Sequence, residues 1–236
     1  MLFGRSRKTE RESEDVLGPR EIEIQDQDTE GRAESGPFDV SEVGDREGYV
    51  DLGAVLISPR PGLELRLEVE ETSQRVVAVT LDLGDSSVQV QAFAAPRSEG
   101  LWDEIREQIA ESVRSQGGQA DQMDGSLGTE LIASVPAEAP DGGRGYRVAR
   151  FVGVDGPRWF LRGVFSGPAA IQQDAATELE ELFRALVVVR GESPMPPREL
   201  LPLTMPTMPQ ETAGEPGDPQ QGLQAPERGP EITEIG

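Results

Sequence analysis

The sequence predicts an α+β fold in which a mainly antiparallel sheet of six or seven strands packs on two helices in two layers, with disordered acidic termini. Three observations support this prediction. Apolar and polar residues alternate with a period of two over residues 63–92 and again over 146–165. In two other segments apolar residues recur at spacings of three and four. Both ends of the chain are polar and acidic.

Composition divides the chain into three parts. Residues 1–47 contain fourteen acids and seven bases, and such a segment buries too little apolar surface to offset its ordering entropy, so we expect disorder. Its first eight residues could alternatively touch a membrane weakly. Residues 48–206 are expected to form the folded domain. The proline-rich, acidic residues 207–236 are expected to be a second disordered segment.

The alternation in the first half of the domain predicts an antiparallel meander with one face exposed to solvent. A two-residue turn at Gly84–Asp85 and a five-residue loop at Glu70–Gln74 would place every large apolar residue on the same side of the sheet. The expected strands are Ala54–Ile57, Leu63–Glu70, Val76–Leu83 and Val88–Ala92. The expected pairs include Leu81 with Val88, Val79 with Val90, Leu67 with Val77 and Leu65 with Val79.

Two helices are expected to cover the apolar face of this sheet. Leu101–Gln116 has helical periodicity, and we interpret its Trp102 as a core anchor. The second helix opens at Ser166–Pro168, because proline is tolerated in a first turn, and Ile171 begins its apolar stripe. Its solvent-exposed face is expected to carry Asp174, Glu178, Glu180 and Glu181.

The remaining segments complete the expected order of four strands, a helix, three strands and a helix. Gln119–Leu127 lacks a clear period and is expected to be irregular, whereas Thr129–Val135 alternates as a strand. Val187–Arg190 could continue the second helix or form a short closing strand, and its three β-branched residues favour the strand. Arg198–Pro206 is expected to be an extended arm with apolar side chains.

The stretch Asp155–Phe165 contains aromatic, branched and glycine residues and predicts a central strand entered from a turn. A turn at Asp155–Gly156 would pair it with the strand at 146–154. Arg150 then lies among apolar residues on the core face, where a charged group needs a partner. The expected pairs are Val152 with Trp159, Arg150 with Leu161, Val148 with Gly163 and Ala149 with Arg162.

The composition also excludes several chemistries. The chain contains no cysteine and no histidine, so disulfides, thiolate or imidazole metal sites and the usual catalytic triads are ruled out. Any general acid or base would have to be Asp, Glu, Lys or Tyr with a shifted pKa. We therefore expect no catalytic residue, no metal site and no cofactor, and the composition argues against an enzyme.

The formal net charge of −22 argues against general nucleic-acid binding, which depends on clustered basic residues. No apolar run approaches the ~20 residues of a membrane helix. Lys8 is the only lysine among 22 basic residues. We attribute this arginine bias to a GC-rich genome, with a salt-adapted surface as the alternative.

Several motifs resemble those of an uncharacterised actinobacterial family, a domain of unknown function, over residues 45 to 206. The resemblance implies an actinobacterial, cytoplasmic protein and brings no reaction, cofactor or catalytic residue with it. The order of elements is also similar to that of PsbP-type sandwiches, an analogy without functional content. The motifs are Ala94–Ser98, Leu101–Glu104, Asp155–Gly163 (DGPRWFLRG) and Leu201–Pro206 (LPLxMP).

The candidate binding site is an anion site formed by Arg147, Arg150, Arg158 and Arg162, with Trp159 as a flat stacking surface. Guanidinium groups bind carboxylate or phosphate with two parallel hydrogen bonds, and an aromatic face can stack a base or a second guanidinium. The alternative is that these arginines pair with the abundant acids and cover the sheet with their stems.

Two functional hypotheses follow. The first is a non-catalytic binding or adaptor module for a protein partner or a small anionic ligand, which could also form a homo-oligomer. The second is a small hydrolase or transferase that uses Asp or Glu side chains and a divalent metal. Asp103, Glu104 and Glu107 could chelate such a metal, although a solvated helix face explains these acids as well.

Overall fold

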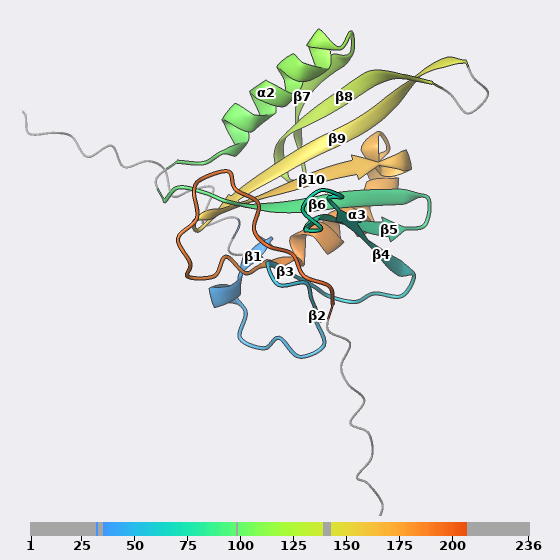
Figure 1. Cartoon of the computed structure of the whole chain (residues 1–236). Coiled ribbons are helices and arrows are strands. Elements are labelled where there is room, and N and C mark those ends of the chain that lie inside the picture. The colour runs from blue at the N-terminus through green and yellow to red at the C-terminus, as the bar shows by residue number, and fades with distance from the viewer. Residues whose placement is uncertain (1–31, 33–34, 98, 139–142, 207–236) are drawn as a thin grey trace, which may run out of the picture.

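The computed structural model describes residues 32, 35–97, 99–138 and 143–206, which form two sheets and two α-helices (Figure 1). The α+β class is confirmed. The predictions of disorder for residues 1–31 and 207–236 lie outside the described residues, as does the alternative of membrane contact by residues 1–8.

The larger sheet has seven strands in the order β4-β5-β6-β10-β9-β8-β7, and all neighbours are antiparallel. The prediction that 119–127 is irregular was wrong, because residues 119–125 form the edge strand β7. This strand is mostly exposed and so lacks an apolar period. The strands are β4 (Leu63–Val69), β5 (Val76–Leu83), β6 (Ser86–Ala94), β7 (Gln119–Gly125), β8 (Gly128–Glu138), β9 (Arg144–Gly156) and β10 (Trp159–Ser166).

The smaller sheet has the order β1-β11-β3-β2. The strand at residues 54–57, which was expected to begin the main sheet, belongs to the smaller sheet instead. The predicted closing strand near residue 187 is confirmed and also belongs to the smaller sheet. The ordered structure starts before residue 48, since β1 pairs in parallel with β11. The strands are β1 (Phe38–Asp39), β2 (Val50–Asp51), β3 (Val55–Ile57) and β11 (Val187–Val188).

The first hairpin registers are partly as expected. Leu81 pairs with Val88 and Val79 pairs with Val90, which confirms the turn at residues 84–85. The β4–β5 register was wrong: Leu67 pairs with Val79, because a longer turn and a β-bulge near Val69 shift the strands by two residues. A shift by an even number leaves every side chain on its expected face.

The register of the β9–β10 hairpin also differs from the expected one. Its turn is at Pro157–Arg158, where Arg158 has φ of 63°, so the expected turn at 155–156 was wrong. The structural pairs are Val152 with Gly163 and Arg150 with Phe165, four residues from the expected register. The faces are again preserved, because the displacement is even.

The two helices cover opposite faces of the larger sheet, so the two-layer arrangement was wrong. α3 (Gln173–Arg184) packs on the face of Leu161 and Phe165, together with part of the smaller sheet. α2 (Trp102–Ser115) packs on the opposite face, against Phe160. Neighbouring residues on β10 are thus buried on both sides of the sheet, and both faces need a cover.

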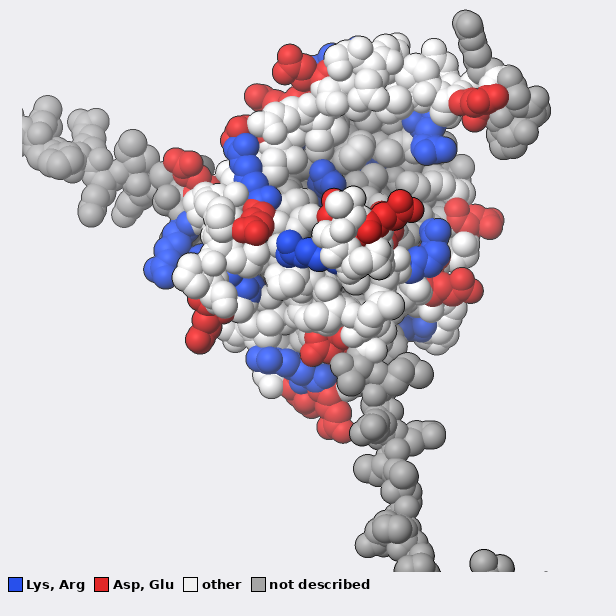
Figure 2. Space-filling view, in the orientation of Figure 1, with Lys and Arg blue, Asp and Glu red and all other residues white. Residues whose placement is uncertain are grey.

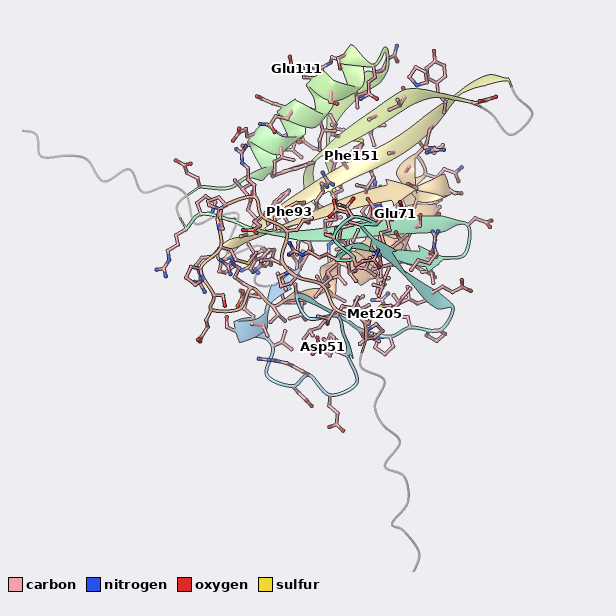
Figure 3. The ribbon with its side chains drawn as sticks, in the orientation of Figure 1. Asp51, Glu71, Phe93, Glu111, Phe151 and Met205 are labelled. Carbon is pink, nitrogen blue, oxygen red and sulfur yellow. The ribbon has the colours of Figure 1, made fainter. Side chains whose placement is uncertain are left out.

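Trp102 is the anchor of α2, as expected. It is 7% exposed, its ring stacks on Phe160 at 6.1 Å between centroids, and its indole N–H donates to the carbonyl of Thr129 at 2.6 Å. A Cβ on Gly153 would lie 2.3 Å from the ring, so only glycine permits this packing. Phe93 and Phe151 belong to the same side of the core, whereas Glu111 lies on the outer side of α2 (Figure 3).

The second helix starts later than expected. Gly167–Ala170 forms a separate 3₁₀-helix, and α3 begins after Gln172. Ile171 lies at the break and is 64% exposed, so its place in the apolar stripe was wrong. Glu180, expected on the wet side, is buried.

The C-terminal arm runs along the C-terminal end of β6, past the residues that pair with β5 (Figure 1, red-orange). Its backbone bonds to the end of β6, where the N–H of Leu201 donates to the carbonyl of Ala92 at 2.9 Å and the N–H of Ala94 donates to the carbonyl of Glu199 at 2.8 Å. Leu201 and Leu203 are buried in the main core. The predicted arm with apolar side chains is confirmed.

Candidate functional site

The structure does not bring the five candidate residues together. Arg150 and Trp159 lie on the α3 face of the sheet, whereas Arg162 lies on the α2 face. Arg147 is exposed on β9, and Arg158 is in the β9–β10 turn. Each arginine therefore has its own environment.

Trp159 is a core residue that fixes the N-terminal segment. It has no exposed surface, and its indole N–H donates to Oδ2 of Asp39 at 2.8 Å. The guanidinium of Arg32 lies 5.4 Å from the ring centroid and is bound by both carboxylate oxygens of Glu42. Its stacking partner is thus a guanidinium of the same chain.

Arg162 also covers aromatic surface. Its guanidinium lies 5.6 Å from the ring of Phe93 and donates to the side-chain oxygen of Gln91. Burial lowers the pKa of Arg162. This environment matches the alternative in which the arginines pack on the sheet.

Arg150 has the partners that its position required. Its Nη1 donates to Oε1 of Glu180 at 2.7 Å and to Oε2 of Glu130 at 3.2 Å, and all three side chains are buried. Two acids around one guanidinium leave an excess negative charge when all three are ionised. Gly125 makes room for this cluster, since a Cβ there would lie 2.2 Å from the Glu130 carboxylate.

Further hydrogen bonds hold the two carboxylates. The backbone N–H of Leu127 donates to Oε1 of Glu130 at 3.1 Å, and the hydroxyl of Ser126 donates to Oε2 of Glu180. The side-chain amide of Gln173 donates to both oxygens of Glu180 at 3.2 Å. The cluster therefore ties the β7–β8 hairpin and β9 to α3.

The sequence carried a weak signal for the two acids that bind Arg150. Glu180 lies four residues after buried Ala176 and three before buried Phe183, which is the spacing of an inward helix face. Glu130 alternates with Leu131 on β8 and so points to the α3 side. Charge alone had placed Glu180 on the wet side.

The pKa values of the two acids shift in opposite directions. Burial raises the pKa of Glu130, and the charge of Arg150 and the bond from Leu127 offset this only in part. Burial also acts to raise the pKa of Glu180, but hydrogen bonds from Ser126 and Arg150 outweigh it and hold that pKa below its usual value. Glu130 is thus the acid that takes up a proton first.

A cleft of about 280 Å³ adjoins the cluster. Arg150 lines it and is only 4% exposed, yet its Nε and Nη2 have no hydrogen-bond partner among the described residues. The N-cap residue of α3, Gln172, makes no side-chain capping bond. The lining residues are Met123, Ile132, Arg150, Ala169, Ala170, Ile171, Gln172 and Gln173.

Acidic and basic side chains are interspersed on the face shown in Figure 2, without a large patch of one sign. The described residues contain no group of three or more acids placed to hold a metal ion. Among the candidate chelators, Asp103 binds Arg106 at 2.8 Å and Glu104 binds Arg198. In the part of the chain that the structure describes, neither helix is long and apolar enough to cross a membrane.

Comparison with known proteins places the chain in a family. No curated protein matches its sequence. Among solved structures it is similar to the solution structure of cyanobacterial PsbP (CyanoP) from Synechocystis sp. PCC 6803, with 13% identity, a TM-score of 0.33 and coverage of 58% of this chain and 87% of that chain. The model of the family described as "Protein of unknown function (DUF3710)" matches residues 36–212, well over half of the sequence, and the chain therefore belongs to this family.

Proposed function

We propose that this protein is a non-catalytic binding or adaptor module that takes an anionic group into the cleft beside Arg150. The observation that supports the proposal is that Nε and Nη2 of this buried guanidinium have no hydrogen-bond partner within the described part of the chain. A cytoplasmic location and an actinobacterial origin, which the sequence motifs imply, are part of the proposal.

The free edge of Arg150 has the geometry for an anion. Nη1 is used by Glu130 and Glu180, whereas Nε and Nη2 form the other edge of the planar group. Two adjacent N–H donors bind a carboxylate or phosphate with parallel hydrogen bonds. Leaving them buried and unpaired costs free energy, which a bound anion would recover.

The surroundings hold Arg150 in place for this role. Its guanidinium carbon lies 4.5 Å from the ring centroid of Phe165, and its two carboxylate partners prevent rotation. Both free nitrogens are shielded from water, so a ligand must displace a side chain at the rim. Ile171 and Gln172 are exposed and can move without disturbing the core, whereas Gln173 is held by its bonds to Glu180.

Thermal unfolding of the full chain with added acetate, phosphate or sulfate tests the proposal. A ligand that binds the folded state raises the free energy of unfolding, by about 2.7 kcal/mol at a hundred times its Kd. We expect at least one anion to stabilise the wild type and this response to be lost in Arg150→Lys, which keeps the charge but not the fork. Arg147→Lys, an exposed position on the same strand, is the control.

The proposal fails if none of these anions stabilises the wild type, or if Arg150→Lys responds like the wild type while circular dichroism shows it folded. Stabilisation by Mg²⁺ or Mn²⁺ in place of anions would instead favour the metal-dependent enzyme. Arg158→Ala and Arg162→Ala are expected to keep the response, because neither residue lines the cleft.

A further inference from the structure

We infer that the cleft beside Arg150 accepts a small monocarboxylic acid with an apolar tail. This inference rests on the proposed anion-binding function and adds the chemical class of the ligand. It follows from three properties of the cleft: the distribution of polar and apolar side chains in its lining, the charge around Arg150, and its volume.

The lining is amphipathic. Arg150, Gln172 and Gln173 form its polar part, whereas Met123, Ile132 and Ile171 contribute large apolar side chains. Met123 and Ile171 are among the large apolar residues that stay exposed in the described part of the chain. A ligand with a charged head at Arg150 and an apolar tail would remove these side chains from water.

The local charge favours a monoanion over a dianion. Arg150 already has Glu130 and Glu180 at hydrogen-bonding distance, so each further negative charge is repelled by these acids. A carboxylate adds one charge and a phosphate close to two. Uptake of a proton by Glu130 would remove one negative charge and so reduce the repulsion between the cluster and an anionic ligand.

The volume limits the size of the ligand. At about 30 Å³ per molecule of liquid water, a cleft of 280 Å³ holds on the order of ten non-hydrogen atoms. An acid of the size of octanoate fits this volume, whereas a longer fatty acid would leave part of its tail in water.

Calorimetric titration of the full chain with acetate, butanoate, octanoate and dodecanoate tests the inference. We expect affinity to rise by up to roughly fourfold for each buried methylene as far as octanoate and then to level off. Acetyl-leucine, compared with its amide, tests whether a peptide terminus can supply the same carboxylate.

Ile171→Ser should weaken octanoate binding several-fold and leave acetate binding unchanged, since Ile171 contacts only the tail in this arrangement. Val69→Ser, an exposed apolar residue on β4 outside the cleft, is the matched control and should change neither.

Four outcomes would overturn the inference. If phosphate and acetate bind but affinity does not grow with tail length, the ligand class is wrong while the anion-binding function stands. If octyl phosphate binds more tightly than octanoate, the ligand class is likewise wrong while the anion-binding function stands. If no carboxylic acid binds while phosphate or sulfate does, the ligand class is again wrong, whereas binding of 1-octanol as tight as that of octanoate would mean that the anion-binding function fails as well.

Discussion

The carboxylate of Asp155, at the end of β9, caps the N-terminus of α2: Oδ1 accepts the backbone N–H of Leu101 at 2.7 Å. Oδ2 accepts the N–H of Trp102 at 3.2 Å. Leu101 itself is the N-cap residue and has no side chain that could cap. A residue 54 positions further along the chain thus supplies the oxygen that Ser or Asp usually provides locally.

Asp155→Ala is therefore expected to lower the free energy of unfolding by about 1–2 kcal/mol, the usual cost of losing a cap. Urea denaturation measures this change. Asp121→Ala, exposed on β7, is the control and should stay within about 0.5 kcal/mol of the wild type. An equal effect at both positions would contradict the capping role.

Glu180 and Glu181 are neighbours on α3 with opposite environments. Glu180→Ala leaves Arg150 buried with one partner fewer, and we expect a loss of about 3–5 kcal/mol. Glu181 pairs with Arg60 at 3.5 Å and its side chain is 60% exposed, so Glu181→Ala should cost less than about 1 kcal/mol. Guanidinium denaturation of both variants would separate them, and similar midpoints would disprove the buried cluster.

The raised pKa of Glu130 predicts a pH dependence of stability. A folded-state pKa above the usual 4.5 means that the folded protein binds the proton more tightly than the unfolded chain. This contribution is therefore present at low pH and is lost as pH rises through the folded pKa. Glu180 has a lowered pKa, so its contribution to the free energy of unfolding has the opposite pH dependence. It is present above pH 4.5 and is lost as the pH falls below that value.

Glu130→Gln mimics the protonated acid and removes the first of these two effects. Relative to the wild type, this variant should gain stability as pH rises from about 4.5 to 7. Urea denaturation at several pH values measures the difference. Glu138→Gln, on the exposed end of β8, should show no such trend, and a flat difference for Glu130→Gln would refute the prediction.

The C-terminal arm predicts a contrast between two of its apolar residues. Leu201 is 2% exposed, whereas Met205 is 66% exposed and lies at the surface (Figure 3). Leu201→Ala should cost about 2–4 kcal/mol through lost burial and the cavity it leaves. Met205→Ala should change stability by less than about 0.5 kcal/mol in thermal unfolding. Equal effects would mean that the arm does not dock as described.

The candidate site was predictable only in part. The alternation around Arg150 placed it on the core face and required a partner for it, and both inferences hold. Its partners are 20 and 30 residues away, and charge alone had assigned Glu180 to the wet side. Trp159 was expected to offer a stacking surface, but it is fully buried, and Asp39, from a segment expected to be disordered, accepts a hydrogen bond from its indole N–H.

By itself, the sequence determined which side chains of β4, β5, β6, β9 and β10 share a face and where α2 lies, because the pleat and the helical period are local properties. It left open which residues pair, since shifts by two or four residues keep the same faces. Only the tertiary structure decided that the helices cover opposite faces, that the arm extends the sheet, and that Glu130 and Glu180 share Arg150. Those arrangements depend on packing between segments far apart in the chain, which no local pattern encodes.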